Sequence, residues 1–286
     1  MQQLPFPIID PHIHQWDPYN TPHAAALAVK LFGNHPKLLD RMVRLLKPRD
    51  VIETIGLTQH LTAPYLPANY KKDAGHYEIE QIVHVEASWH DHKGTGVVNE
   101  TRFIAGLPFD QHTIQLGGIV ATADPRQKNF KQLIQLHREA SPKFRGIRKM
   151  AAVHPDKGIH AWTDEPHLYR NTDFLKGFEE LARQDLSFDA WVYTLPRLRM
   201  LLRWPKPFQT PLLCWIIWVR PQVYLAKWAK LQARPNKIAP RYLQTGKISW
   251  QNWPNAKMYR PKCLVCLCQS WDMIFTRRNG WQVNRN

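Results

Sequence analysis

The chain has 286 residues, 44% of them hydrophobic, which is enough for one large α/β domain or two smaller ones. It has no run of about eighteen apolar residues that would cross a membrane, and its start, MQQLPFPII, lacks the basic residues and long apolar stretch of a secretory signal. We therefore expect a cytoplasmic protein, although a net charge of +16 would by itself suggest a nucleic acid or an anionic surface as partner.

The charge is unevenly distributed along the chain. Of the 39 Lys and Arg, 17 lie after residue 193, whereas one of the 23 Asp and Glu, Asp272, lies there, so residues 1–193 carry 22 residues of each sign. All 14 His precede residue 194, while all four Cys and eight of the twelve Trp follow it. These differences predict two regions, 1–193 and 194–286, that join near Tyr193 and differ in origin.

Within residues 1–193, short apolar runs alternate with amphipathic stretches. The runs that predict strands are FPIIDPHIH (6–14), QIVHVEAS (81–88), LGGIVATADP (116–125), KFRGIRKM (143–150) and LSFDAWVY (186–193). Residues 23–46 predict one or two helices after the first strand. The apolar residues of 127–140 and 171–185 recur on one helical face, and Asn171 to Asp173 offer an N-cap.

Strands that alternate with helices predict a parallel sheet. Each predicted strand ends in residues able to do chemistry, namely His12 and His14, Glu86, Asp124, Arg148 and Asp189. This arrangement is typical of a (β/α)8 TIM barrel, whose active site lies at the carboxyl ends of the strands. Residues 1–193 hold about five strand–helix units, and eight are needed to close such a barrel.

His12 and His14 follow the first apolar run with one residue between them. Residues i and i+2 of a strand point to the same side, so both imidazoles can reach one point at the barrel mouth. Two neutral imidazoles suit a divalent metal, zinc or manganese, which would activate water and polarise a carbonyl. Asp10 has the same parity and is expected to orient an imidazole. The alternative is a pair of histidines exposed in a loop.

The segments IIDPHIHQWDP (8–18), YLPANYKKDAGHYEIEQIVHVEA (65–87), FRGIRKM (144–150) and FDAWVY (188–193) resemble, in this order, the amidohydrolase-related (amidohydrolase 2) family of TIM-barrel metal-dependent hydrolases, in particular its lactonase-like branch. The resemblance covers about residues 7–193. It implies that His12 and His14 hold the metal. It also implies a substrate site lined by His84, Glu86, Arg148 and Asp189.

Three of these substrate-site residues also have a structural interpretation. Glu86 would serve as a capping or salt-bridging residue, Arg148 would pair with a neighbouring loop, and Asp189 would cap the following helix. An arginine at a strand end also suits a substrate carboxylate or a developing oxyanion. The sequence leaves both sets of interpretations open.

The last third of the chain resembles a gene read in the wrong frame. The family would continue with a sixth strand that ends in a Leu-Asp-His-Leu-Gly-like segment, whereas this chain has CWIIWV at 214–219. Moving the reading frame back by one nucleotide converts CWIIWV into Leu-Asp-(His/Tyr/Asn)-(Leu/Met)-Gly, in which the codons force Asp and Gly. The same shift turns SWDMIF (270–275) into a sequence that permits Gly-His-Asp-Phe. We therefore predict a frameshift near Tyr193 to Leu195 and an irregular or helical tail with no family structure.

The resemblance implies a hydrolase that acts on a lactone or related carbonyl compound through activated water, and we expect the tail to impair it. The expected cofactor is a divalent metal, zinc or manganese, although a metal-free site is an alternative. The expected partner is a small carbonyl or lactone substrate, possibly a carboxylate or sugar acid, rather than a nucleic acid or membrane. The competing interpretation is a non-catalytic fragment or a basic protein that binds nucleic acid through Lys, Arg and Trp side chains of residues 194–286.

Overall fold

The computed structural model describes residues 8–23, 25–55, 57–154 and 159–193. In the last third it describes four strand segments, 213–217, 265–266, 273–276 and 280–283. The predicted frameshift junction and the rest of the basic, Trp-rich tail lie outside the described residues.

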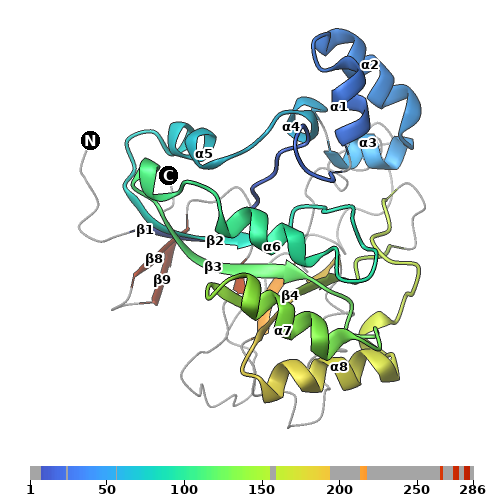
Figure 1. The fold of residues 1–286 in the computed structure, drawn as a ribbon, viewed down its shortest axis with the longest axis vertical. Helices are drawn as coiled ribbons and strands as arrows, with labels where there is room; N and C mark the ends of the chain where they lie inside the picture. The colour runs from blue at the N-terminus through green and yellow to red at the C-terminus, as the bar shows by residue number, and fades with distance from the viewer. Residues whose placement is uncertain are drawn as a thin grey trace, which may run out of the picture.

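A parallel sheet forms the centre of the molecule, and its strands lie side by side in chain order (Figure 1). The first five strands coincide with the five predicted ones. They are β1 (Ile8–Ile13), β2 (Ile79–Val85), β3 (Gln115–Thr122), β4 (Phe144–Met150) and β5 (Ser187–Val192). Every neighbouring pair among them is parallel, as strand–helix alternation requires.

Helices connect the strands, and those between β2 and β5 lie along the sheet (Figure 1). These are α6 (Val98–Ala105), α7 (Phe130–Ala140) and α8 (Thr172–Arg183). The long connection from β1 to β2 holds five more: α1 (Ala26–Phe32), α2 (Pro36–Leu46), α3 (Arg49–Ile55), α4 (Gln59–Thr62) and α5 (Pro67–Ala74). Residues 23–46 therefore form two helices, and Pro36 at the first turn of α2 marks the break.

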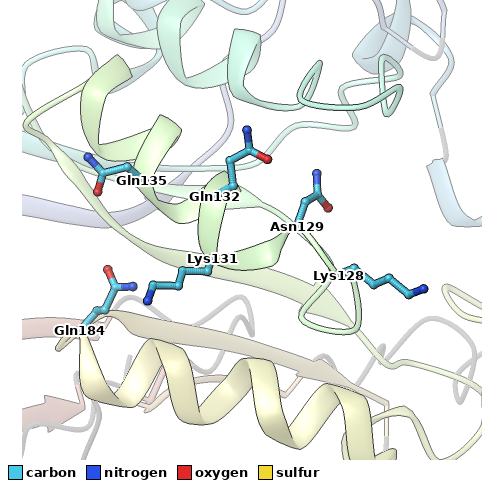
Figure 2. Close-up of a pocket in the computed structure, with 6 residues that line it drawn as sticks. All are labelled: Lys128, Asn129, Lys131, Gln132, Gln135 and Gln184. Carbon is cyan, nitrogen blue, oxygen red and sulfur yellow. The ribbon is translucent and has the colours of Figure 1, made fainter.

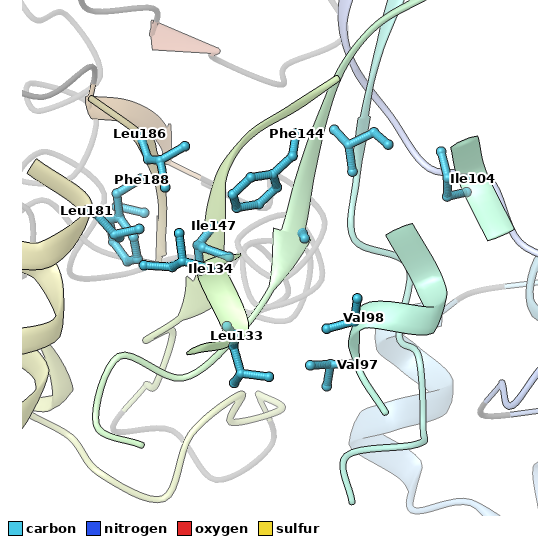
Figure 3. Packing of buried hydrophobic residues seen from close by; sticks show 14 of the residues in the cluster. Val97, Val98, Ile104, Leu133, Ile134, Phe144, Ile147, Leu181, Leu186 and Phe188 are labelled. Carbon is cyan, nitrogen blue, oxygen red and sulfur yellow. The ribbon is translucent and has the colours of Figure 1, made fainter. Parts of the chain in front are cut away.

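The main core lies between the sheet and helices α6 to α8. Phe188 of β5 meets Phe174 and Phe178 of α8 edge to face, with ring centroids 5.6 and 5.4 Å apart. Leu133 and Ile134 of α7 are completely buried in the same cluster, part of which Figure 3 shows. The predicted amphipathic faces of residues 127–140 and 171–185 are confirmed by this packing.

Helices α1 and α2 form a second, much smaller core, and Figure 1 shows them with α3 standing away from the sheet. Its buried residues are Ala25, Val29, Leu39 and Val43. No helix in the described part of the chain combines the length and the apolar character needed to span a bilayer.

The sheet is curled rather than flat. Strands β1 and β4 have two strands between them, which in a flat sheet would separate them by about 14 Å. The Nη2 atom of Arg148 on β4 nevertheless lies 3.2 Å from Nε2 of His12 on β1. The two side chains therefore meet across a concave face, as in part of a (β/α) barrel.

The described segments of the last third are strands, which differs from the expected irregular or helical chain. β6 (Leu213–Ile217) pairs in parallel with β5, and β7 (Val265–Cys266) pairs with β6. β8 (Met273–Thr276) and β9 (Gly280–Val283) form a separate antiparallel pair. The apolar, continuous sequence LCWII is typical of a strand in a parallel sheet whatever the origin of its codons.

Candidate active site at the carboxyl ends of the strands

His12 and His14 turn their imidazoles toward each other at the end of β1. Their Nε2 atoms are 3.1 Å apart, and the rings meet edge to face with centroids 4.9 Å apart. The carboxylate of Asp10 accepts the backbone N–H of His12 at 3.0 Å and the hydroxyl of Tyr70 at 2.9 Å. Asp10 thus fixes the backbone of the histidine pair rather than an imidazole ring, which corrects our expectation for it.

The hydrogen-bond partners define the proton positions of the histidine pair. Nδ1 of His14 lies 2.8 Å from the carbonyl oxygen of Val85 and 3.0 Å from that of Glu86, so Nδ1 carries the proton. Nε2 of His12 accepts from the guanidinium of Arg148, which can only donate. With these tautomers neither Nε2 carries a proton, so the two nitrogens lie 3.1 Å apart without a hydrogen bond between them, an unfavourable contact that a bound cation would relieve.

Both imidazoles are neutral, which is the form that binds metals. Burial, aided by the charge of Arg148, lowers the pKa of His12 to about 2 and that of His14 to about 4. No group of three or more His, Cys, Asp or Glu that would hold a metal occurs in the described part of the chain. The pair therefore fits two positions of a metal site, and a third protein ligand is missing from these residues.

Arg148 and Asp189 form an ion pair beside the histidines. Nη2 of Arg148 is 3.1 Å from Oδ2 of Asp189, and the two residues are only 5% and 1% exposed. The guanidinium carbon lies 5.9 Å from the ring centre of Trp191. Burial raises the pKa of Asp189, against the opposing effect of Arg148. Among the described residues, Nε of Arg148 and Oδ1 of Asp189 are buried and have no hydrogen-bond partner.

Glu86 and His84 complete the group of residues expected at the site. Oε2 of Glu86 accepts the N–H of Ser88 at 3.2 Å, and the charge of Glu86 acts on His14, His84 and Asp189. His84 is completely buried and pairs across the sheet with Ile13. Each of the six residues singled out in the sequence thus interacts electrostatically with at least two of the others. Their roles as metal or substrate ligands stay predictions.

Asp124, at the end of β3, does not join this group. Its carboxylate binds Arg126 at 2.6 Å and Lys149 at 3.2 Å, and Arg126 continues to Glu165 at 2.7 Å. The hydrogen bonds and opposite charges of Arg126 and Lys149 lower the pKa of Asp124 despite its burial. Asp124 therefore belongs to a structural ion-pair network.

Three other residues near the site were not identified from the sequence. Glu100 of α6 is buried beside His84, with Oε1 at 3.7 Å from Nε2 of the imidazole. The side chain of Gln15 is buried and has no hydrogen-bond partner among the described residues. Trp191 shares the parity of Asp189 on β5, so strand alternation would have revealed it, whereas nothing in the local pattern marks Glu100 or Gln15.

The surface pocket shown in Figure 2 is separate from the candidate site. It lies on the outer surface at α7 and the end of α8. Its lining consists of Lys128, Asn129, Lys131, Gln132, Gln135 and Gln184. It contains no carboxylate, imidazole or thiol for acid–base or metal chemistry, so the candidate site is the concave face of the sheet.

No family model matches the chain. Over 187 residues it is 30% identical to the uncharacterized protein y4mH of Sinorhizobium fredii, a match that covers 65% of this chain and 54% of that protein. The chain thus spans about half the length of the curated relative. A crystal structure of an amidohydrolase from Burkholderia multivorans with bound HEPES gives a TM-score of 0.47 at 19% identity, covering 74% of this chain and 57% of that one. The functional assignment rests on the strand-end side chains.

Proposed function

We propose that residues 8–193 carry part of the active site of an amidohydrolase-type, lactonase-like hydrolase, and that residues 194–286 are an out-of-frame tail that impairs it. One observation carries the proposal: histidines at the end of β1 meet a buried arginine–aspartate pair from β4 and β5 at the concave face of a parallel sheet. In barrel enzymes the active site is likewise built from side chains that meet at the carboxyl ends of parallel strands.

Arg148 and Asp189 supply the binding and proton-transfer groups. The guanidinium suits a substrate carboxylate or the oxyanion that forms when water attacks a lactone carbonyl. Asp189 has a raised pKa and an oxygen without a partner among the described residues. It would take the proton from the attacking water and return it to the departing alkoxide as the ring C–O bond breaks. Glu86 is the second carboxylate within range.

His12 and His14 would hold a divalent cation, zinc or manganese. Such an ion would polarise the substrate carbonyl and lower the pKa of a bound water molecule. The two unprotonated Nε2 atoms, 3.1 Å apart, fit a cation, and Nη2 of Arg148 would have to leave His12 to free its lone pair. In a metal-free version of the site, the contact between Arg148 and His12 would persist, and the imidazoles would bind the substrate directly.

The frameshift proposal rests on the codons rather than on the position of β6. β6 pairs with β5, where a sixth barrel strand belongs, and its last residue, Ile217, is in register with Val192. In the shifted frame the codons of Ile216 and Ile217 overlap the (His/Tyr/Asn) position. A histidine there would follow the same edge of the sheet as the site and would be a candidate for the missing third ligand. Sequencing the gene across residues 190–220 tests this, and an uninterrupted reading frame would refute it.

The proposed hydrolase is tested by expressing this chain and a frame-corrected version in parallel. Each is assayed against a panel of sugar-acid and dicarboxylate lactones, and its metal content is measured. We expect hydrolysis by the corrected chain, at least a hundredfold less by this chain, and loss of activity in the corrected chain with His12→Asn. His35→Asn, which changes an exposed histidine on α2's N-terminal side, is the matched control. An inactive corrected chain, or one unaffected by His12→Asn, would contradict the proposal.

A further inference from the structure

Glu100 occupies the first turn of α6, and its side chain lies behind the end of β2. It is 3% exposed, and its Oε1 accepts the backbone N–H of Ala87 at 2.6 Å. The second oxygen, Oε2, is buried and has no hydrogen-bond partner in the described part of the chain. A buried carboxylate held by one short hydrogen bond is costly for stability, which calls for a role beyond packing.

The N–H that Glu100 binds belongs to the same peptide group as a carbonyl that binds His14. The peptide between Glu86 and Ala87 donates its N–H to Glu100, and its C=O accepts Nδ1–H of His14 at 3.0 Å. The carboxylate, the peptide and the imidazole therefore form one hydrogen-bond chain, beside the shorter contact of the same Nδ1 with the carbonyl of Val85 at 2.8 Å. Burial raises the pKa of Glu100 to about 7, so at about pH 8 its carboxylate is mostly ionised. That negative charge at the N–H end polarises the peptide and makes its carbonyl a stronger acceptor.

A second chain of contacts connects Glu100 to the backbone of His14. Nδ1 of His84 accepts the N–H of Gln15 at 3.2 Å, so the proton of this neutral imidazole lies on Nε2. That nitrogen faces Oε1 of Glu100 at 3.7 Å. This separation is too long for a hydrogen bond, and Nε2 of His84 has no hydrogen-bond partner among the described residues, so the link from Glu100 through His84 to the backbone N–H of Gln15 is electrostatic.

We propose that Glu100 is a positioning residue for His14. It holds the Glu86–Ala87 peptide so that Nδ1 of the imidazole stays protonated and Nε2 points toward His12, and it raises the electron density on Nε2. Groups that bind the far nitrogen of a metal-binding histidine commonly change metal affinity by about 10–100-fold when they are removed. The consequence for a bound cation rests on the proposed function, whereas the effect on the His14 ring does not.

The test measures the His14 ring directly in the full-length chain labelled with 15N-histidine, at about pH 8 and without added metal. Signals of His14 are assigned with His14→Asn. In the wild type we expect a proton on Nδ1 that exchanges slowly with solvent. In Glu100→Gln and Glu100→Asp we expect exchange of this proton to become at least tenfold faster. Glu165→Gln, which removes an equivalent charge from the Arg126 network, should leave the signal unchanged.

Three results would overturn the proposal: a wild-type proton on Nε2, an unchanged exchange rate in whichever Glu100 variants fold, or the same acceleration in Glu165→Gln. Titration of the same proteins with zinc alone gives a separate readout, for which we expect 10–100-fold weaker binding in the Glu100 variants. If the wild type binds no zinc while the exchange results hold, the cation part of the proposed function fails and the positioning role stands.

Discussion

The two faces of strand β5 are built from opposite chemistry. Phe188, Ala190 and Val192 point to the helices and are completely or almost completely buried among aromatic and aliphatic side chains. Asp189 points to the concave face, where it shares burial with the guanidinium of Arg148. Apolar burial on the helix-covered face stabilises the fold, whereas the desolvated charges on the concave face offset part of that stabilisation. Stability and candidate chemistry are therefore separated by one residue along the same strand.

Removing the largest apolar group of the covered face should have the largest effect. Phe188→Ala leaves a cavity among Phe174, Phe178 and Tyr169, and we expect the free energy of unfolding to fall by about 4 kcal/mol. Urea denaturation followed by circular dichroism measures it. Tyr77→Ala, at a position 51% exposed, should change it by less than about 0.5 kcal/mol. Equal effects of the two substitutions would mean that this face is not the main core.

On the concave face, the loss of unfolding free energy caused by a substitution depends on whether it leaves a buried charge without its partner. Arg148→Met leaves Asp189 buried without its cation, and we expect a loss of about 3 kcal/mol. The double variant Arg148→Met/Asp189→Leu removes both charges and should regain most of that stability. A double-mutant cycle measured by urea denaturation decides this. A double variant as unstable as the sum of the single ones would show that the ion pair contributes no coupling.

A buried histidine makes the covered face sensitive to acid. His137 stacks on Phe144 and binds the Thr101 hydroxyl, and burial lowers its pKa from 6.5 to about 4. The unfolded chain binds this proton below about pH 6.5 while the folded chain does not, so stability is lost as the pH falls from there toward 4. Between pH 7.5 and about 5, His137 should account for about 2 kcal/mol of the loss.

The difference in unfolding free energy between these two pH values is compared in the wild type and in His137→Gln. Because the other buried histidines contribute equally to both proteins, they cancel. The variant should lose about 2 kcal/mol less than the wild type on acidification. An identical loss would show that His137 is accessible to protons in the folded chain.

The smallest expected effect concerns the helix that covers β5. The side-chain oxygen of Asn171 accepts the N–H groups of Asp173 and Phe174 at 2.9 and 3.1 Å and caps α8, as the sequence predicted. Asn171→Ala should cost about 1 kcal/mol, and Asn171→Asp, which also caps, should cost less. Thermal unfolding monitored by circular dichroism distinguishes the two, and an unchanged midpoint for Asn171→Ala would mean that α8 does not need its cap.

The five strands and the faces of α7 and α8 could be predicted because each depends on a local hydrophobic period. Convergence of His12 and His14 is also local, since it follows from their spacing. The meeting of Arg148 with His12, 136 residues apart in the chain, depends on the curvature of the sheet, which no local pattern encodes. The position of Glu100 behind β2 depends on how α6 returns to the sheet, and it was missed for the same reason.

The order in which the chain folds follows from one feature of the sheet. Ile8 of β1 pairs with Ile79, across a connection that holds α1 to α5, whereas Ile119 pairs with Phe144 only 25 positions away. Closing a longer loop costs more conformational entropy, about 0.6 kcal/mol for each doubling of its length. β1 should therefore join a sheet that β2 to β5 have already nucleated. His12 and His14 would then reach the site late in folding, and slow steps in refolding should coincide with the docking of β1.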